Sequence, residues 1–190
     1  MTEALRAPRL DDPRWVRLRE IIAARSLKRG HFRLASGRES DVLFDLKLTL
    51  LDPEGANLTA ELMLDRLEQW PARCIGGPEM GGVLIVQALC VRSQGRNRLR
   101  FFFVRKRAKD HGTGNRIDGH LEAGAEAVLV EDVTTTGGSV MEAVEAVRAL
   151  GCPVRRVLAI LDRNEGGRER LAGEGLVLDY IFEKADFAPT

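Results

Sequence analysis

Short apolar segments alternate with amphipathic helical patterns from residue 73 onward, and this alternation limits the fold more than any other feature of the sequence. The apolar segments lie at 73–75, 99–104, 127–130, 157–161 and 177–182, and the clearest helical patterns between them lie at 83–91 and 139–150. Alternating strands and helices are typical of a mostly parallel sheet flanked by helices on both faces. The sequence therefore predicts an α/β fold, in which ligands bind at the carboxyl ends of the strands.

The residues before this alternation follow a different pattern. Asp12 followed by Pro13 is typical of the start of a helix, and apolar residues at helical spacing continue the pattern until Gly30. Strand-like segments follow at 31–35 and 42–46, with a turn-rich Ser-Gly-Arg between them. We therefore expect one helix and one strand pair, followed by a second helix marked by leucines, ahead of the sheet.

Charge and composition exclude several classes of function. The 29 basic and 28 acidic residues leave a net charge of +1, which argues against binding to nucleic acid or to a membrane surface. No apolar stretch approaches the roughly 20 residues of a membrane-spanning helix, and the N-terminus lacks the apolar region of a signal peptide. Cys74, Cys90 and Cys152 have neither disulfide-framework nor zinc spacing, so we expect reduced thiols in a cytoplasmic protein.

The strongest functional signal is a strand–loop–helix segment at 128–139. It reads Val128-Leu129-Val130-Glu131-Asp132-Val133-Thr134-Thr135-Thr136-Gly137-Gly138-Ser139. The loop amides, the hydroxyls and the helix N-terminus would form an anion site, yet the two carboxylates beside it would repel a bare phosphate. Hydrogen bonds from the hydroxyls of a sugar attached to that phosphate explain the acids. Helix capping needs only one such residue, and the Gly-Lys-Ser/Thr ending of a Walker A loop is missing.

A second segment is basic and also follows a predicted strand. It reads Val104-Arg105-Lys106-Arg107-Ala108-Lys109-Asp110-His111-Gly112-Thr113-Gly114, and residues 105–119 hold five Lys or Arg and two Asp. Taken alone, such a run is usually a solvated loop. Here it should lie at the same sheet edge as the 128–139 loop, where a diphosphate leaving group needs cations. Asp110 and His111 could supply acid–base or hydrogen-bonding groups.

The 128–139 segment resembles the motif with which type I phosphoribosyltransferases bind 5-phosphoribosyl diphosphate (PRPP). In that family the two acids hold the ribose 2′- and 3′-hydroxyls, and the loop holds the 5′-phosphate. The resemblance implies these PRPP-binding residues in this chain: Glu131, Asp132, Val133, Thr134, Thr135, Thr136, Gly137, Gly138 and Ser139.

The basic run resembles the signature of orotate phosphoribosyltransferases, which is far more specific than the PRPP motif. In that family the loop closes over PRPP and reaches into the site of the partner subunit. The resemblance implies PRPP contacts for Arg105, Lys109 and His111, and a homodimer in which Lys106 is donated across the interface. The candidate catalytic residues are Lys106, Lys109, Asp110 and His111.

Three further stretches agree with this family in the same order along the chain. Residues 32–40 resemble the N-terminal segment that lies over orotate, 75–82 resemble the diphosphate loop, and 161–167 resemble the segment whose arginine meets orotate. The candidate orotate-binding residues are Thr135 and Arg163. A guanidinium binds a carboxylate bidentately, but without the resemblance Arg163 would be read as a surface arginine.

The sequence also departs from the family. Ala35 stands where many members carry a lysine, Gly81 stands where some carry one, and Glu131 replaces a commoner aspartate. These losses could weaken binding or alter the base that is used. The residues that could restore the missing charge are Arg33, Arg38 and Lys47.

The resemblance predicts a single domain over residues 1–190, with an N-terminal helix and a small hood over the site in about 1–50 and an α/β core in about 55–190. It implies transfer of the phosphoribosyl group from PRPP to orotate in de novo pyrimidine (UMP) biosynthesis. Mg²⁺ is the expected cofactor, held mainly through PRPP and not by a protein metal site. The alternatives are a phosphoribosyltransferase for another base and a PRPP-binding regulator without catalysis.

Overall fold

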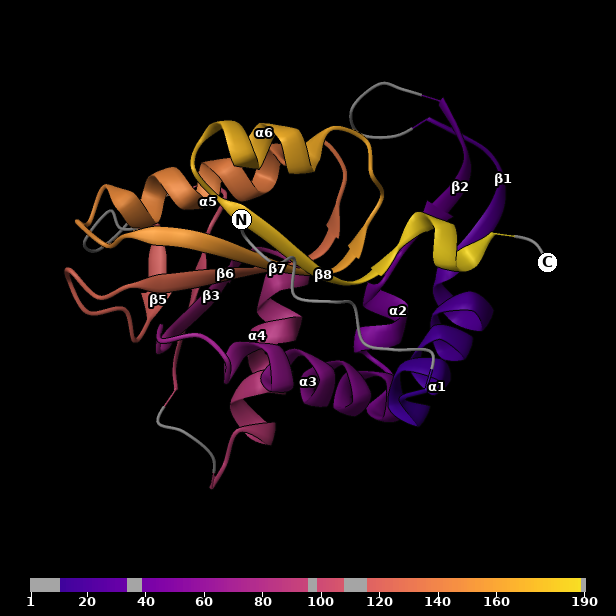
Figure 1. Cartoon of the computed structure of the whole chain (residues 1–190), viewed down its shortest axis with the longest axis horizontal. Coiled ribbons are helices and arrows are strands. Elements are labelled where there is room, and N and C mark those ends of the chain that lie inside the picture. The colour runs from indigo at the N-terminus through magenta and orange to yellow at the C-terminus, as the bar shows by residue number, and fades with distance from the viewer. Residues whose placement is uncertain (1–10, 34–38, 96–98, 108–115, 189–190) are drawn as a thin grey trace.

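The computed structural model describes residues 11–33, 39–95, 99–107 and 116–188. A six-stranded sheet with helices on both faces forms most of the structure, and a two-stranded sheet lies beyond the carboxyl ends of its parallel strands (Figure 1). The predicted α/β fold, a mostly parallel sheet flanked by helices with a small N-terminal hood, is therefore confirmed.

The large sheet has the strand order β5-β4-β3-β6-β7-β8. Its strands are β3 (Cys74–Pro78), β4 (Arg100–Val104), β5 (Ile117–Gly119), β6 (Ala127–Thr134), β7 (Val154–Asp162) and β8 (Val177–Glu183). All neighbouring pairs are parallel except β4 with β5. The carboxyl ends of β3, β4, β6 and β7 therefore meet at one edge, where the predicted motifs follow them.

Helices cover both faces of this sheet. They are α1 (Pro13–Ile21), α2 (Lys47–Leu50), α3 (Pro53–Leu67), α4 (Gly81–Arg92), α5 (Gly138–Arg148) and α6 (Gly167–Gly173), with a π-helical turn at Ile22–Ser26 and a 3₁₀ turn at Lys184–Phe187. The α1, α3 and α4 helices pack on one face, and α5 and α6 pack on the other (Figure 1).

The apolar side chains of β6 pack into the cores on both faces of the sheet. Val128 and Val130 belong to the core under α3 and α4, whereas Ala127 and Leu129 belong to the core under α5. Successive side chains of a strand point to opposite faces, so a strand buried on both sides must be apolar at every position. The first polar residues of β6 therefore mark the place where the strand leaves the core and the site begins.

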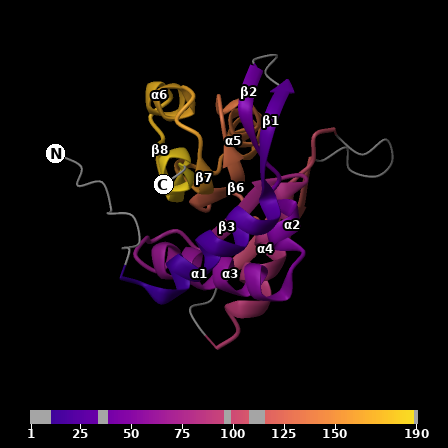
Figure 2. The same ribbon diagram turned by 90° about the vertical axis from the view of Figure 1, so that its right-hand side faces the viewer.

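The N-terminal hairpin consists of β1 (Leu27–Arg33) and β2 (Glu39–Phe44), paired antiparallel. It stands above the α1–α3 helices with β8 and α6 to one side (Figure 2). At its base the buried hydroxyls of Ser26 and Thr49 lie 2.7 Å apart in a hydrogen bond. The Phe44 ring packs against Phe187 after β8, with ring centroids 5.3 Å apart. These contacts fix the hairpin over the carboxyl end of the sheet.

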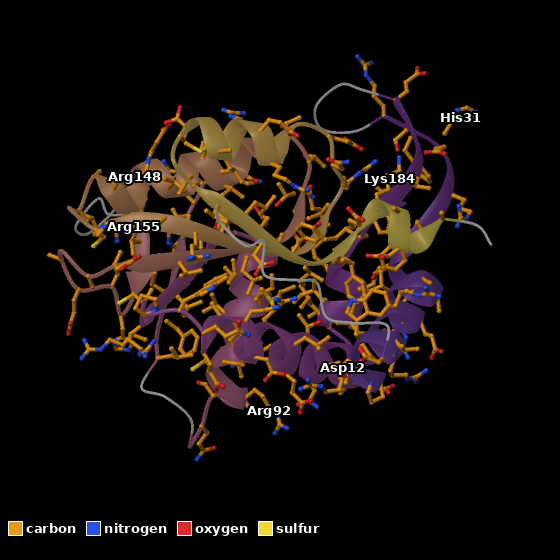
Figure 3. All side chains as sticks on the ribbon, in the orientation of Figure 1. Asp12, His31, Arg92, Arg148, Arg155 and Lys184 are labelled. Atoms are coloured by element: carbon orange, nitrogen blue, oxygen red, sulfur yellow. The ribbon has the colours of Figure 1, made fainter. Side chains whose placement is uncertain are left out.

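The start of the first helix is as the sequence predicts. The Oδ1 atom of Asp12 accepts a hydrogen bond from the backbone N of Arg14 at 2.8 Å, and Pro13 is the first helical residue. Asp12 lies beside the helices that cover the lower face of the sheet (Figure 3). The Nε1 of Trp15 donates to the carbonyl of Ile181 at 3.0 Å, which ties this helix to β8.

The end of that helix was predicted incorrectly. The helical backbone ends at Ser26, and β1 already begins at Leu27, before Gly30. Gly30 has a φ of 151° and lies where the β1–β2 register shifts between Arg29 and Phe32. Gly30 therefore lies in an irregularity of the strand pairing and does not end the helix. Both positions are common for glycine.

Two short elements have no clear signal in the sequence. The β5 strand lies inside the segment expected to be a loop at 105–120, and it pairs with β4 through only a few residues. The α6 helix has seven residues, too few for a periodic apolar pattern. No helix among the described residues is long and apolar enough to cross a lipid bilayer.

Candidate active site

The carboxyl end of β6 and the start of α5 form the centre of the candidate site. Glu131 is 5% exposed, and its Oε2 accepts a hydrogen bond from the Ser139 hydroxyl at 2.9 Å. Its Oε1 accepts one from the backbone N of Asp132 at 3.1 Å. The buried carboxylate therefore ties the end of the strand to the first turn of the helix, and the loop between them is held closed.

This loop presents hydroxyl groups and the N-terminus of α5. Gly137 directly precedes the helix with a φ of 73°, a left-handed conformation that favours glycine. A Cβ at Gly167 would lie 2.6 Å from the carbonyl oxygen of Thr135, so α6 packs tightly against the loop. The free N–H groups and dipole of a helix N-terminus attract anions, so the loop is suited to hold a phosphate group.

Asp132 connects this loop to the segment after β3. A Cβ at Gly81 would lie 2.3 Å from the carboxyl carbon of Asp132 and 2.5 Å from both of its oxygens. The carboxylate therefore rests directly on the backbone at the start of α4. A larger side chain at position 81 would require the Asp132 carboxylate to shift.

The two acids differ in their surroundings. Glu131 is buried, whereas Asp132 is partly exposed at the edge of the sheet. Burial raises the pKa of the Glu131 carboxyl well above its usual value, and the neighbouring charge of Asp132 raises it further. The negative charge of the pair is therefore concentrated at the more exposed Asp132, which can meet polar groups of a ligand.

The first residues of the basic segment lie beside this pair of loops. The Arg105 Nε donates to Asp118 Oδ2 at 2.5 Å, and the backbone N of Lys106 donates to Glu79 Oε1 at 2.8 Å. Arg105, Lys106 and Glu79 line a small pocket together with Ser139. The structure therefore brings the start of the basic segment, the 75–82 segment and the 128–139 loop together. Lys109, Asp110 and His111 lie outside the described residues.

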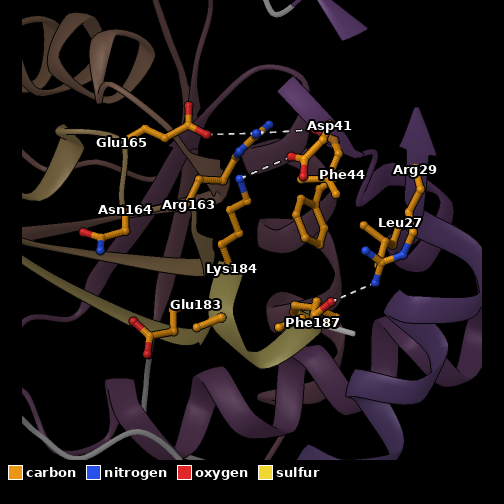
Figure 4. A pocket seen from close by; sticks show the side chains of 13 residues that line it. Leu27, Arg29, Asp41, Phe44, Arg163, Asn164, Glu165, Glu183, Lys184 and Phe187 are labelled. Carbon is orange, nitrogen blue, oxygen red and sulfur yellow. Dashed lines mark hydrogen bonds and ion pairs between the residues drawn. The ribbon is translucent and has the colours of Figure 1, made fainter. Parts of the chain in front are cut away.

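Arg163 follows β7 and is buried, with 3% of its surface exposed. Its Nη2 donates to the Ser40 hydroxyl at 2.8 Å and forms an ion pair with Glu165 at 2.9 Å. Its Nε is buried without a hydrogen-bond partner among the described residues. Figure 4 shows Arg163 with Glu165, Phe44 and Lys184 on the wall of a pocket of ≈ 510 Å³ beneath the hairpin.

A second ion pair holds the turn that presents Arg163. Asp162 is fully buried and accepts hydrogen bonds from Arg168 Nη2 at 2.6 Å and from the backbone N of Asn164 at 2.9 Å. The Arg168 guanidinium also lies 4.8 Å from the centroid of the Tyr180 ring. The backbone of Asn164 has a φ of 55°, so these contacts fix an unusual turn directly after Arg163.

A further ion pair lies at the base of the hairpin, at the start of α2. The Lys47 Nζ lies 2.6 Å from Asp45 Oδ1, and both side chains are partly exposed. The hydrogen bond with Asp45 raises the pKa of the Lys47 amino group, and the negative charges of Asp45 and Asp132 contribute to the same shift.

Comparison with known proteins decides the family. A model described as the phosphoribosyl transferase domain matches residues 49–184. An orotate phosphoribosyltransferase of Rhodopseudomonas palustris is 44% identical over 179 residues, which cover 92% of this chain and 96% of the relative. One of Pyrococcus furiosus is 36% identical over 163 residues, covering 85% and 87%. The chain belongs to the orotate phosphoribosyltransferase family.

Solved structures agree with this membership. The orotate phosphoribosyltransferase of Mycobacterium tuberculosis, crystallised with Fe(III) dicitrate, superposes with a TM-score of 0.82 at 32% identity and covers 93% of this chain and all of that one. A second structure of that enzyme contains PRPP and superposes with a TM-score of 0.78 at 29% identity, covering 92% and 99%. The family predicted from the 128–139 and 105–112 segments is therefore confirmed.

Sequence reasoning placed Ser40, Asp162 and Glu165 in segments near the site but gave them no individual role, and it did not single out Arg168. Ser40 and Glu165 bind the predicted Arg163, and Asp162 with Arg168 holds the turn that presents it. The contact between Arg163 and Ser40 joins residues far apart in the sequence, so no local pattern indicates it. The expectation of a surface arginine at 163 without the family resemblance is wrong, because the hairpin covers this side chain.

We expect Glu131→Gln to stabilise the folded protein at neutral pH. The folded state binds a proton at Glu131 more tightly than the unfolded chain does, so stability falls as pH rises toward the raised pKa. The melting temperature of the variant should therefore exceed that of the wild type more at about pH 7.5 than at about pH 4.5. In a domain of this size each kcal/mol corresponds to roughly 2–4 °C.

The control is Glu142→Gln, an exposed carboxylate on α5. It should show no comparable dependence on pH. A Glu131→Gln variant whose melting temperature differs from the wild type equally at both pH values would contradict the account of a buried, repelled carboxyl.

Proposed function

We propose that the chain transfers the 5-phosphoribosyl group from PRPP to orotate, giving orotidine 5′-phosphate and diphosphate in de novo pyrimidine (UMP) biosynthesis. The observation that carries this proposal is the meeting of the Glu131–Asp132 pair with a phosphate-type loop, the 75–82 segment and the start of the basic segment. The curated relatives named orotate phosphoribosyltransferase cover nearly the whole chain, which favours orotate over another base and catalysis over simple binding.

We assign the two ends of PRPP to different parts of this site. Asp132 and Glu131 accept hydrogen bonds from the ribose hydroxyls, and the loop at 133–139 with the α5 N-terminus holds the 5′-phosphate. The basic segment meets the diphosphate: the proposed contacts are Arg105, Lys106, Lys109 and His111, with Asp110 beside them. In this assignment the ribose lies beside the closely packed β6–α5 turn, between the two anionic ends of PRPP.

Arg163 and Thr135 are the proposed contacts of orotate. Arg163 lines the pocket beneath the hairpin, its Nε lacks a partner among the described residues, and a guanidinium donates charge-assisted hydrogen bonds to a carboxylate. Glu165 and Ser40 already hold the Nη2 side of the guanidinium, so its orientation is set before the substrate arrives. A fixed orientation lowers the entropic cost of binding.

Mg²⁺ fits this arrangement as an ion brought with PRPP. No group of three potential metal ligands among His, Cys, Asp and Glu converges in the described part of the chain. Mg²⁺ commonly keeps several waters and binds through substrate phosphates, so a site without a protein cage suits it. When bound, it neutralises charge on the diphosphate oxygens.

In the proposed reaction the protein acts mainly by electrostatic stabilisation of the charges that develop as the bond breaks. Departure of diphosphate leaves positive charge on the ribose ring and adds negative charge to the leaving group. The carboxylate of Asp132 lies on the ribose side and the basic segment lies on the diphosphate side, so each end of the breaking bond meets the opposite charge. The ring nitrogen of orotate then attacks C1, and no covalent enzyme intermediate is needed.

A cytoplasmic location is part of the same proposal. Cys74 and Cys152 are buried, Cys90 is exposed, and all three thiols are free. Free thiols are the usual state in a reducing compartment. This supports the expected setting for an enzyme of nucleotide synthesis.

We also propose a homodimer. Large apolar side chains are exposed around the 75–82 segment and the adjoining helices: Leu48 43%, Leu51 70%, Met80 59% and Val91 66%. A groove of ≈ 360 Å³ runs between α2, α3 and α4 on this side. Met80 directly follows Glu79, which binds Lys106, so a second copy seated on this face would lie beside the basic segment.

The proposed reaction is tested with purified protein, PRPP, Mg²⁺ and a panel of free bases. We expect loss of orotate absorbance only when all three components are present, and no turnover of uracil or hypoxanthine. Turnover of another base without turnover of orotate would contradict the assignment of orotate as the substrate. Full activity after chelation of Mg²⁺ would contradict the assignment of Mg²⁺ as the cofactor.

Arg163→Ala sharpens this test. Loss of a charge-assisted hydrogen bond costs about 1.5–3 kcal/mol, so the KM for orotate should rise by roughly one to two decades while the KM for PRPP changes little. Equal damage to both constants would indicate a general disturbance of the site and would count against the orotate contact.

Shared sites in the homodimer are tested by mixing two inactive variants, Lys106→Ala and Asp132→Asn. If Lys106 serves the partner's site, one site of a mixed dimer collects both substitutions and the other is intact. Random exchange gives about half mixed dimers, so roughly a quarter of wild-type activity should return. Absence of recovery after verified subunit exchange would show that Lys106 acts within its own subunit.

A further inference from the structure

We propose that Lys184 is a second cationic contact of the base, which binds the carboxylate of orotate together with Arg163 and makes the pocket selective for an acidic base. The proposal rests on the proposed function, because it takes the pocket beneath the hairpin as the orotate site. It adds a cation from the C-terminal turn, which follows β8 and lies outside every segment that carries a motif.

Lys184 and Arg163 line the same pocket and contact consecutive residues of β2. The Lys184 Nζ lies 3.7 Å from Asp41 Oδ1, and the Arg163 Nη2 donates to the carbonyl of Val42 at 3.4 Å. All four residues line the pocket of ≈ 510 Å³, and Figure 4 shows both cationic ends on the side of Asp41. Contacts with adjacent residues of one strand therefore bring the two cations to the same part of the pocket.

The turn that carries Lys184 is anchored, so its side chain starts from a fixed backbone position. The backbone N of Glu183 donates to Asp186 Oδ2 at 2.8 Å within the turn. Phe187 at the end of the turn is buried, and its carbonyl accepts a hydrogen bond from Arg29 Nη2 at 3.0 Å. The Lys184 side chain is 41% exposed, so only this side chain has to move to meet a ligand.

The contact between Lys184 and Asp41 is one that an anion can displace. The charged residues described in the lining are of both signs: Arg29, Arg163, Lys184, Asp41, Glu165 and Glu183. Glu165 lies 2.9 Å from the buried Arg163, whereas Asp41 is 83% exposed and lies 3.7 Å from Lys184. An exposed carboxylate can turn into water at little cost, so Lys184 can exchange Asp41 for the carboxylate of a ligand.

A carboxylate on the base needs more donors than Arg163 alone offers. The Arg163 Nη2 already donates to Ser40 and Val42 and pairs with Glu165, and its Nε is buried without a partner among the described residues. A carboxylate has about four acceptor sites, and a lysine ammonium has three donors. Lys184 supplies the remaining donors. Uracil and hypoxanthine carry no carboxylate, so this cation favours orotate over them.

A clamp that only holds the hairpin to the C-terminal turn is the competing explanation for the Asp41–Lys184 pair. Exposed ion pairs contribute little to stability, and the contacts of Phe187 with Phe44 and Arg29 already join these elements. The two explanations differ in what they predict for Asp41. A clamp should fail equally from either partner, whereas a substrate contact depends on Lys184 and is opposed by Asp41.

The experiment measures initial rates of the full-length protein with PRPP, Mg²⁺ and orotate, and gives the KM for each substrate. The variants are Lys184→Met, Lys184→Arg and Asp41→Asn. The matched control is Lys28→Met, which removes an exposed lysine of β1 that lies outside this pocket.

We expect Lys184→Met to raise the KM for orotate by about tenfold or more, with a change of less than about twofold in the KM for PRPP. Lys184→Arg should raise it less, because it keeps the charge. Asp41→Asn should lower the KM for orotate, because it frees the amino group. Lys28→Met should behave like the wild type.

An unchanged KM for orotate in Lys184→Met would overturn the proposal, and so would equal increases in Lys184→Met and Asp41→Asn. The second comparison also decides the matter if Lys184→Met lowers the melting temperature, since a clamp would then fail from both sides. A wild-type protein that turns over no orotate would instead contradict the proposed function itself, so the two failures are distinguishable.

Discussion

Glu131 lies at the end of β6 with almost no exposure to solvent, and it accepts a hydrogen bond from Ser139 at the first turn of α5. A buried carboxylate is costly unless it is hydrogen-bonded, so this contact both stabilises the acid and closes the loop between strand and helix. Asp132 is then directed away from the core, toward the 75–82 segment. The geometry of the whole site follows from this one turn.

Charge at the site is distributed by what the backbone permits. Asp132 occupies the space that a side chain at Gly81 would need, so no cation can stand at that position while the acid keeps its place. The positive charge beside the site comes from the start of the basic segment after β4.

The central part of this molecule could be predicted from the sequence because its signals are local. The β6 strand is apolar at every position up to Glu131, and the loop and helix that follow are marked by Thr, Gly and Ser. The end of the first helix was predicted wrongly, because Gly30 belongs to an irregularity between paired strands that a single segment does not show.

The surroundings of Arg163 could not be predicted for a similar reason. Its partner Ser40 lies 123 residues away in the sequence, and the hairpin that buries it is placed by contacts with the C-terminal turn. Lys109, Asp110 and His111 lie outside the described residues, so their proposed roles stay predictions.

The central claim is that the acids after β6 bind the sugar of PRPP beside its phosphate, and calorimetric titration of PRPP into wild-type protein and Asp132→Asn tests it most directly. The substitution keeps the size of the side chain and removes its charge. Loss of a hydrogen bond to a charged group predicts weakening of PRPP binding by about one to two decades, with an unchanged melting profile as the sign of an intact fold. Equal affinity of the two proteins for PRPP would contradict the account.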